Sequence, residues 1–389
     1  MSTRPRSLVV ATLGTTQTLS WGSSYYLPAI LATPIAAELG LSRAAVFGMF
    51  SGALLLTAFL GPTAGRAIDK RGGRDVLALS NLLFIAGLLL MASAQGAVVL
   101  ALSWAILGVA MAMGLYDAAF ATLAGLYGKE ARNAITGITL IAGFASTVGW
   151  PTSALMEAEF GWRGACIGWA LLHLLVAMPL NLFLPRTPPP APKAVATRAD
   201  ATPPDSASQR RAMVLLAFML AATGFTSSAL GAHLPTLLQA AGATAGAAIA
   251  ASALLGPAQV GARILEFGLL RRIHPLASAR IATATHPIGV AVLLALGAPA
   301  AVAFVLLHGA GNGLVTIARG TLPLALFGPA GYGHRQGLIT APARATSALA
   351  PFGFGLLVDW AGADALWLTA ILGVLALMSL LMLQPPRPN

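Results

Sequence analysis

The sequence predicts an all-α membrane protein with twelve transmembrane helices. Hydrophobic residues make up 57% of its 389 residues, only 9% are charged, and the mean hydropathy is +0.80. A soluble domain carries about a quarter of its residues as charged side chains. The apolar residues also gather in runs of about 20, the length that a helix needs to cross a hydrocarbon core of about 30 Å. A soluble fold is therefore excluded.

Twelve such runs follow one another along the chain, with boundaries that are soft by several residues. Short segments that contain charged residues, glycine or proline separate them. The predicted spans are 8–32, 44–66, 76–95, 97–126, 134–157, 162–184, 212–239, 246–270, 276–296, 299–327, 337–358 and 364–384. The first has no small-residue cleavage site after a short apolar region, so we expect a retained helix rather than a signal peptide.

Positive charges fall on alternate sides of these spans. The formal net charge is +11, and Lys and Arg gather at the termini and in every second loop. Only Arg43 and Arg163 fall in the other loops, which instead hold acids such as Glu38 and Asp359. Because Lys and Arg resist translocation, this asymmetry predicts that both termini lie in the cytoplasm. The basic balance thus reflects membrane topology, and we expect no nucleic-acid partner.

A long polar segment divides the chain into two halves of six spans each. It is rich in Pro, Ala, Thr and Ser and too poor in large apolar residues to fold. We predict an N-terminal six-helix bundle over 1–184, a cytoplasmic linker over 185–211 and a C-terminal six-helix bundle over 212–389. Cys166 is the single cysteine, so neither a disulfide framework nor a cysteine metal site is expected.

The two halves echo each other weakly. Gly61-Pro62 in the second span corresponds to Gly256-Pro257 in the eighth, and Gly114-Leu-Tyr-Asp117 in the fourth corresponds to Gly313-Leu-Val-Thr316 in the tenth. The order of these matches is the same in both halves. Repeats related by an axis along the membrane normal occur in several transporter folds.

Five of the ionisable side chains inside the predicted spans are candidates for a role in transport. In hydrocarbon each costs several kcal/mol unless it has a partner, a water-filled cavity or a function. They are Asp117, Arg263, Glu266, Arg319 and Arg344. Three bases against two acids leave one positive charge for an anion. A guanidinium fork matches a planar carboxylate or another oxyanion, so the excess favours a small organic anion as the ligand.

The two acids are candidates for proton coupling. Asp117 lies about eleven residues before the cytoplasmic end of its span, hence about 16 Å deep. Burial favours the protonated form of a carboxyl group, so Asp117 or Glu266 could take up and release a proton. Two structural alternatives stay open: a permanent salt bridge between Asp117 and Arg319, and a self-neutralising pair of Arg263 and Glu266 on one helix face.

Polar uncharged residues lie in the same spans, several of them at helical spacing and so on common faces. Gln17, Tyr25 and Tyr26 in the first span and Asn312 in the tenth are candidates for lining a solute cavity. The small hydroxyl residues nearby are more often helix-packing residues in membranes.

One loop between two spans carries a specific motif. The stretch Gly65-Arg-Ala-Ile-Asp69-Lys70-Arg71-Gly72-Gly73-Arg74 resembles the signature loop of the major facilitator superfamily of transporters. In that loop a Gly is followed four residues later by an Asp, then by bases and Gly, and Gly65, Asp69, Lys70, Gly72 and Arg74 fill these places. Glycine permits the positive φ and close approach of a tight turn, and the acid can face a helix N-terminus. The resemblance implies that this loop gates the conformational change.

This resemblance covers nearly the whole chain. It implies two six-helix bundles with a central cavity lined by spans one, four, seven and ten, where Asp117 and Arg319 would confront each other or a shared ligand. It also implies alternating access by rocking of the two halves. The superfamily's carboxylate and oxalate carriers place cationic side chains in spans eight and eleven, and Arg263 and Arg344 would correspond to them by analogy.

Two features separate the chain from the drug and proton antiporters of that superfamily. Gly108 is preceded by Trp104 where those proteins carry an Arg, and their Gly-Pro signature is interrupted, reading Gly149-Trp150-Pro151. The run Phe160-Gly-Trp-Arg-Gly-Ala165 instead resembles that of monocarboxylate-type carriers.

We therefore expect a secondary active transporter that moves a small solute, an organic anion or oxyanion, across the inner membrane of a bacterium by proton-coupled alternating access. The alternatives are an efflux pump for a drug or toxic compound, and a non-transporting receptor on the same fold. No nucleotide phosphate loop and no constellation of nucleophile, base and metal occurs in the sequence, so neither an enzyme, a metal nor a cofactor is expected. The expected partners are the solute, protons and the lipid bilayer, and the protein is expected to be a monomer.

Overall fold

The computed structural model describes residues 5–127, 131–186, 207–268, 274–327 and 332–383, and the regular elements in these ranges are helical. The chain divides into two compact units, Met1–Lys193 and Ala194–Asn389, and we describe each by itself. The division falls inside the predicted linker, most of which lies outside the described residues.

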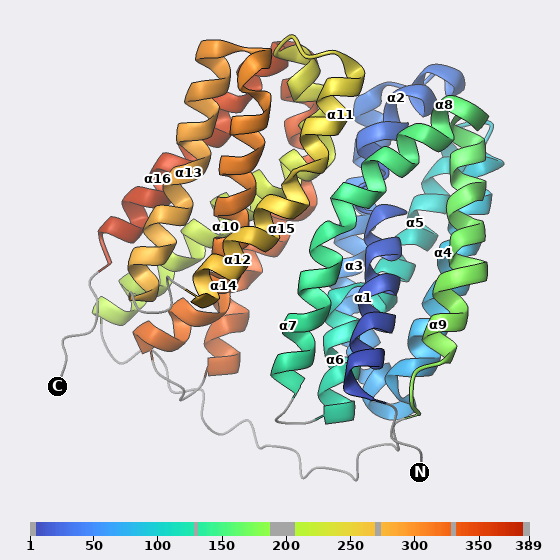
Figure 1. Ribbon diagram of the computed structural model, residues 1–389, viewed down its shortest axis with the longest axis horizontal. Coiled ribbons are helices and arrows are strands. Elements are labelled where there is room, and N and C mark those ends of the chain that lie inside the picture. Colours follow the sequence, from blue (N-terminus) through green and yellow to red (C-terminus); the bar gives the residue numbers. More distant parts are fainter. Residues whose placement is uncertain (1–4, 128–130, 187–206, 269–273, 328–331, 384–389) are drawn as a thin grey trace. The chain divides into compact units, whose positions relative to one another are not determined.

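The N-terminal unit is drawn from blue to green in Figure 1. Its helices are α1 (Arg6–Gly22), α2 (Pro28–Leu39), α3 (Arg43–Arg71), α4 (Gly73–Ala92), α5 (Ala97–Gly114), α6 (Tyr116–Tyr127), α7 (Ala131–Ile141), α8 (Ala145–Leu172) and α9 (Met178–Leu182). A π-helical stretch, His173–Ala177, joins α8 to α9.

The C-terminal unit continues the colour series to red. Its helices are α10 (Ala207–Ala240), α11 (Ala245–Ala253), α12 (Leu255–Gly268), α13 (Pro275–Leu296), α14 (Ala301–Phe327), α15 (Tyr332–Ala361) and α16 (Leu366–Leu381).

The described helices fit the twelve predicted spans. Nine stretches among them are long and apolar enough to cross a membrane, but Ala134–Leu182 has 49 residues and Leu338–Leu381 has 44, whereas one crossing takes about 20. Each folds back at a glycine, Gly161 (φ 70°) or Gly362 (φ 58°), in a conformation that disfavours a side chain. The first predicted span adds one more crossing to these. It is not among the nine because its two helices, with 17 and 12 residues, are each too short to count as a crossing alone.

Three predicted spans are each broken into two helices by residues that belong to no helical element. Residues 23–27 separate α1 from α2, extended Leu115 (φ −88°, ψ −169°) separates α5 from α6, and Leu254 separates α11 from α12. A break leaves backbone groups without intrahelical partners. At membrane depth such groups are tolerated where they are buried in protein or line a polar cavity. The breaks therefore mark positions with a role beyond spanning.

The signature loop is shorter than the sequence predicts. Helix α3 runs through Gly65 to its end and α4 begins at Gly73, so Gly72 (φ 84°, ψ 152°) makes the turn alone. Apart from the backbone of its own helix, no atom of the described residues lies within 4 Å of a Cβ built on Gly65. The close approach falls at Gly73, where a Cβ would overlap the side chain of Thr122 in α6.

The remaining loop residues lie at the ends of the same two helices. Lys70 is exposed in the last turn of α3 and Arg74 is half-buried in the first turn of α4. The side chain of Asp69 lies outside the described residues, so its expected contact with a helix N-terminus stays a prediction.

The two units repeat one helix contact. A Cβ on Gly108 of α5 would lie 2.8 Å from the carbonyl oxygen of Ala53 in α3, and a Cβ on Gly313 of α14 would lie 2.5 Å from that of Gln259 in α12. Small residues let backbones touch in this way in membrane proteins. Spans two and four and spans eight and ten thus pack alike, which extends the weak echo in the sequence.

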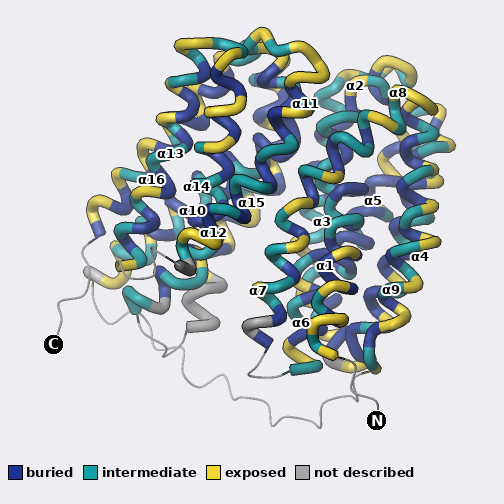
Figure 2. The backbone as a smooth tube through the Cα atoms, viewed as in Figure 1, coloured by how far each residue is buried: buried dark blue, intermediate teal, exposed yellow. Residues whose placement is uncertain are grey.

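Each unit has its own buried core, and the outward faces of its helices are exposed (Figure 2). Leu13, Leu77 and Ile138 belong to the N-terminal core. Large apolar side chains such as Val98, at 74% exposure, and Leu175, at 68%, lie on outward faces, as expected of a surface that meets lipid.

Candidate solute-binding sites

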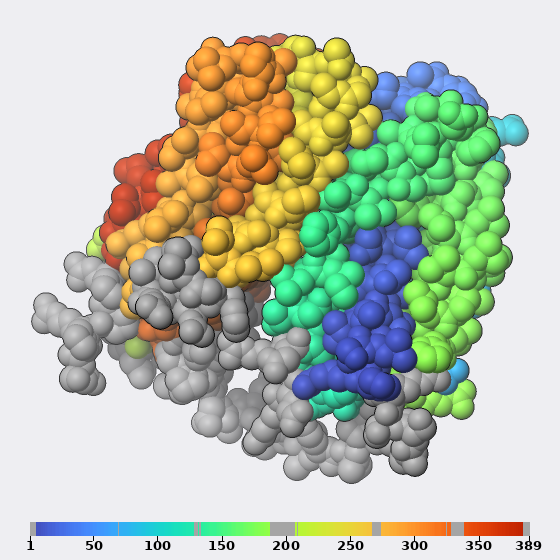
Figure 3. All heavy atoms as spheres, viewed as in Figure 1, coloured from blue at the N-terminus to red at the C-terminus, as the bar shows by residue number. Residues whose placement is uncertain are grey.

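In the N-terminal unit, a hydrogen bond links the first span to the break in the fourth. Figure 3 shows α1 in dark blue, between α7 and α8 on one side and α9 on the other. The Nε2 of Gln17 in α1 donates a 2.6 Å hydrogen bond to the carbonyl oxygen of Gly114, the last residue of α5. Gln17 is buried, and its Oε1 is a buried acceptor with no hydrogen-bond partner among the described residues.

Aromatic rings gather at both breaks. The ring centroid of Trp21 lies 5.0 Å from that of Tyr25, 6.3 Å from Tyr26 and 5.1 Å from Tyr116. Tyr26 lies 5.3 Å from Trp150 of α8. The two predicted tyrosines are thus brought together around Trp21, which sequence reasoning treated as a packing residue. We name Trp21, Tyr25, Tyr26 and Tyr116 the aromatic cluster.

Asp117 follows the aromatic cluster directly along the chain. It lies in the first turn of α6, just after the break, and its side chain is exposed. A carboxylate is favoured at a helix N-terminus, where unsatisfied N–H groups carry partial positive charge. The predicted salt bridge to Arg319 joins different units and stays a prediction.

A buried histidine, His173, bonds to Ser23, the first residue of the first break. Both ring nitrogens of His173 make hydrogen bonds. Nε2 lies 2.7 Å from the Oγ of Ser23, and Nδ1 lies 2.9 Å from the Oδ1 of Asn81. The amide nitrogen of Asn81 donates to the carbonyl of Leu77, so its oxygen faces the ring and accepts from Nδ1. Sequence reasoning missed this network, although a histidine and an asparagine inside apolar runs were a signal.

In the C-terminal unit, two predicted arginines are exposed. Arg319 lies in α14 and Arg344 in α15. The residues that precede them, Ala318 and Ala343, belong to one buried cluster with Leu220 of α10. Each arginine therefore follows a residue of the same core cluster.

The other predicted pair lies on α12. Arg263 and Glu266 are both half-buried, and the Oε2 of Glu266 accepts a 2.7 Å hydrogen bond from the hydroxyl of Ser278 in α13. This bond gives Glu266 a packing role between two helices. It does not decide between the predicted proton role and the predicted pairing with Arg263.

A cavity of about 30 Å³ lies in the C-terminal unit. The helices around it are α10, α13, α14 and α16, and its polar lining is Thr223, Thr226, Thr283, His286, His308 and Asn312. Of the residues predicted to line a solute cavity, Asn312 lies in this lining. His286 was missed, because the sequence does not show that its span faces the tenth. Among the described residues, no group of three or more His, Cys, Asp or Glu could hold a metal ion.

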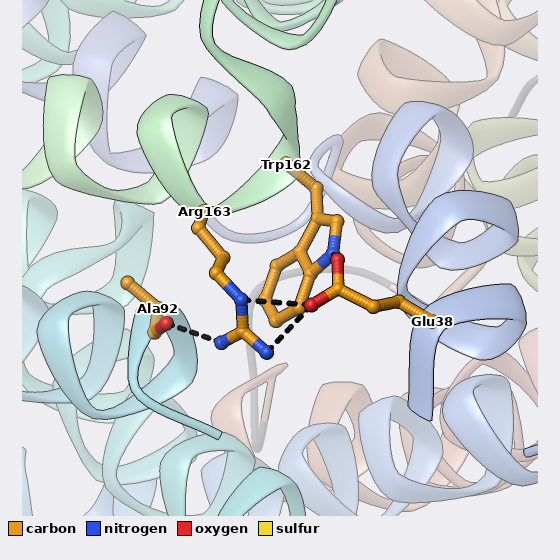
Figure 4. Close-up of polar contacts among 4 residues, drawn as sticks. All are labelled: Glu38, Ala92, Trp162 and Arg163. Atoms are coloured by element: carbon orange, nitrogen blue, oxygen red, sulfur yellow. Dashed lines mark hydrogen bonds and ion pairs between the residues drawn. The ribbon is translucent and has the colours of Figure 1, made fainter. Parts of the chain in front are cut away.

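Residues of the Phe160 to Ala165 run take part in a network of hydrogen bonds and an ion pair at one end of the N-terminal unit (Figure 4). Trp162 and Arg163 point to Glu38 at the end of α2, with Trp162 Nε1 2.5 Å from Glu38 Oε2 and Arg163 Nη2 2.8 Å from Oε1. Arg163 also donates to the carbonyl of Ala92, which ends α4. Hydrogen bonds from Trp162 and then Arg163 lower the pKa of the Glu38 carboxyl. Arg163, an exception to the charge asymmetry, is thus neutralised by an acid.

Helical units with broken spans, intramembrane charges and a cavity lined in part by polar side chains define a polytopic membrane transport protein. The chain belongs to the Major Facilitator Superfamily, because the model of that family matches residues 13–306. It is accordingly a transporter and not an enzyme.

Two solved transporters share the fold. A bacterial homologue of the human lysosomal transporter Spinster, in an inward-facing and occupied conformation, is 16% identical with a TM-score of 0.70 over 98% of this chain and 96% of its own. A variant of the nucleoside transporter NupG is 14% identical with a TM-score of 0.76 over 97% of this chain and 98% of its own.

One relative was found by sequence. An uncharacterised 38 kDa protein in a 23S RNA operon of Thermoproteus tenax is 29% identical over 360 residues, which cover 91% of this chain and 90% of that protein.

Proposed function

We propose that this chain is a proton-coupled secondary transporter of a small organic anion, in the inner membrane of a bacterium, with both termini in the cytoplasm. The observation that supports an anionic solute is the pair Arg319 and Arg344. Both are exposed, and each follows a residue of the same core cluster. Hydrocarbon does not tolerate such charges, so they face a polar space.

Two exposed guanidinium groups suit a carboxylate better than any other common solute group. Each presents N–H donors in a planar fork that can bind both carboxylate oxygens. No acid lies within a helical turn of either arginine along the sequence. Arg263 would add a third cation on the eighth span, which is the weaker part of the proposal because Glu266 lies three residues away.

Movement of the solute would use the broken spans. Helix ends inside the membrane can rotate about short non-helical segments, and the Gln17 hydrogen bond joins α1 to the break after Gly114. The signature loop, with Gly65, Asp69, Lys70, Gly72 and Arg74, would limit the rocking at the cytoplasmic side. Asp117 and Glu266 are the carboxylates available for a proton.

The test uses the protein in liposomes that contain a pH-sensitive dye. Pools of small organic anions, oxyanions and drug-like cations are added outside. Proton flux evoked by anions alone, and reduced roughly tenfold or more in Arg319→Ala, is expected, since losing a charged hydrogen bond costs about 1.5–3 kcal/mol. Arg211→Ala, which removes an exposed arginine from the first turns of α10, is the matched control. Flux that is unchanged in Arg319→Ala would refute the anion site.

A second candidate is efflux of a drug or toxic compound, and the aromatic cluster favours it. Four rings at the breaks of spans one and four offer stacking surfaces for a planar apolar body. In the same liposomes this candidate predicts flux with drug-like cations, and its loss in Trp21→Ala. If only anions evoke flux, the candidate is eliminated.

A further inference from the structure

The cavity of the C-terminal unit lies within helices that cross the membrane, and polar side chains stand among the residues that line it. Its walls come from α10, α13, α14 and α16 of one unit. Glycines bring these helices together: a Cβ on Gly373 of α16 would lie 3.1 Å from Pro287 of α13, and one on Gly311 of α14 would lie 2.5 Å from the carbonyl oxygen of Ala282. The cavity is therefore built by close helix packing.

Two histidines face each other in it. The rings of His286 and His308 lie edge to face with centroids 4.8 Å apart, at 7% and 4% exposure. Both ring nitrogens of His286 are buried without a hydrogen-bond partner among the described residues. Asn312 follows His308 by four residues, so its side chain lies on the same face of α14. Buried polar atoms of this kind call for a bound polar partner.

The size of the cavity selects that partner. A water molecule needs at least about 10–15 Å³ of such volume, so about 30 Å³ admits one or two waters and no organic solute. Among the described residues that line it, the titratable ones are His286 and His308. Other ionisable side chains on the surrounding helices and their neighbours lie elsewhere along them: Arg210, Arg211, His233, Arg263, Glu266, Arg280, Arg319, Arg344 and Asp359.

We propose that His286 and His308, together with bound water, form a proton-binding site that holds one proton between the two rings. Neutral imidazole offers a lone pair at one nitrogen, where the proton adds, and the second ring or a water accepts the new N–H. Two imidazolium ions this close would repel each other, so the pair takes one proton rather than two.

This site rests on the proposed function for its role, because it would supply the coupling proton in place of Asp117 or Glu266. Proton uptake would place a new N–H donor between α13, which carries His286, and α14, which carries His308. The two helices therefore have a means of responding to a proton inside one unit.

The first experiment observes the protons directly and needs no substrate. The full chain, labelled with ¹³C at the histidine Cε1, is placed in lipid nanodiscs, and histidine resonances are followed from about pH 4 to 8. His286→Gln and His308→Gln identify the two resonances. His173 is the internal control, since Ser23 and Asn81 bond both of its nitrogens.

We expect the resonances of His286 and His308 to move together with pH, and the His308→Gln change to shift the curve of His286 by roughly half a pH unit or more. The His173 resonance should stay still. Flat curves for both residues, or curves that ignore replacement of the other ring, would overturn the site. His308→Asn provides a second variant if His308→Gln does not yield folded protein.

The second experiment uses the liposome assay with the anion pool that evokes proton flux in the wild type. His286→Gln should lose that flux roughly tenfold while it keeps exchange of the same anions across the membrane. Full proton flux in His286→Gln would overturn the coupling role. Paired titration without any evoked flux in the wild type would refute the proposed function and still support the proton site.

Discussion

The side-chain amide of Gln17 donates a 2.6 Å hydrogen bond to the carbonyl oxygen of Gly114, 97 residues further along the chain. The donor lies in the first span, and the acceptor is the last residue before the break in the fourth. A helix end leaves such carbonyls without partners. One side chain therefore makes the interruption of another helix tolerable.

Replacing Gln17 by Leu should destabilise the N-terminal unit. The substitution keeps a similar volume but leaves a buried carbonyl without a partner, which costs about 1–3 kcal/mol. The thermal unfolding midpoint of the protein in detergent micelles should fall. Gln239→Leu is the control, because Gln239 is exposed and makes only a local 3.4 Å bond. Equal midpoints for the two variants would contradict the role of the bond.

Gly313→Ala should destabilise the C-terminal unit. The added methyl group meets the backbone of Gln259 at 2.5 Å, and a backbone cannot move aside as a flexible side chain does. Overpacking of this kind costs about 1–3 kcal/mol. Gly353→Ala in α15 adds the same atom where nothing lies within 4 Å, so it should be neutral or slightly stabilising. The two unfolding midpoints, measured side by side, test the contact.

Glu38→Gln should remove an acid-sensitive part of the stability. Hydrogen bonds from Trp162 and Arg163 lower the pKa of Glu38 in the folded protein. Its contribution is complete above about pH 4.3, the pKa of an unperturbed glutamate, and is lost as the pH falls through the lower folded value. The variant should be less stable than the wild type at neutral pH, and the gap should close on acidification. A gap that persists in acid would show that the charge is not responsible.

Arg280→Ala should loosen the end of α16. The guanidinium donates to the carbonyl oxygen of Leu380 at 3.0 and 3.1 Å and to that of Leu383 at 2.8 Å. It thus satisfies carbonyls that the helix end leaves open. Loss of charged hydrogen bonds should cost about 1.5–3 kcal/mol, measured as earlier proteolysis of the C-terminal end. Arg280→Lys keeps the positive charge but lacks the planar guanidinium group. Its proteolysis rate should lie between those of the wild type and Arg280→Ala.

The sequence predicts the spans well because lipid imposes a simple rule on them. A crossing segment must be apolar for about 20 residues, and this can be counted in one dimension. The observed bounds of α13, Pro275–Leu296, differ from the predicted 276–296 by a single residue. The breaks could not be predicted from hydropathy, because Leu115 and Leu254 are apolar and hydropathy does not record backbone conformation.

The candidate site was predictable only in part, for a related reason. Charges inside a span are rare, so Asp117, Arg319 and Arg344 could be singled out from the sequence. Which residues meet across helices depends on helix rotation and register, so neither the facing rings of His286 and His308 nor the position of Trp21 within the aromatic cluster could be anticipated. The motif ascribed a close approach to the glycines of the loop in general, and packing against Thr122 places it at Gly73.

The seven tryptophans of the chain are unequally shared between the two units. Trp104, Trp150 and Trp169 of the N-terminal unit are almost completely buried, whereas Trp360 and Trp367 of the C-terminal unit are 85% and 54% exposed. Bromine atoms on lipid acyl chains quench indole rings that they can touch, and rings enclosed by protein escape them. The intrinsic fluorescence of the protein therefore carries two separable signals, an unquenched one from the first half and a lipid-sensitive one from the second.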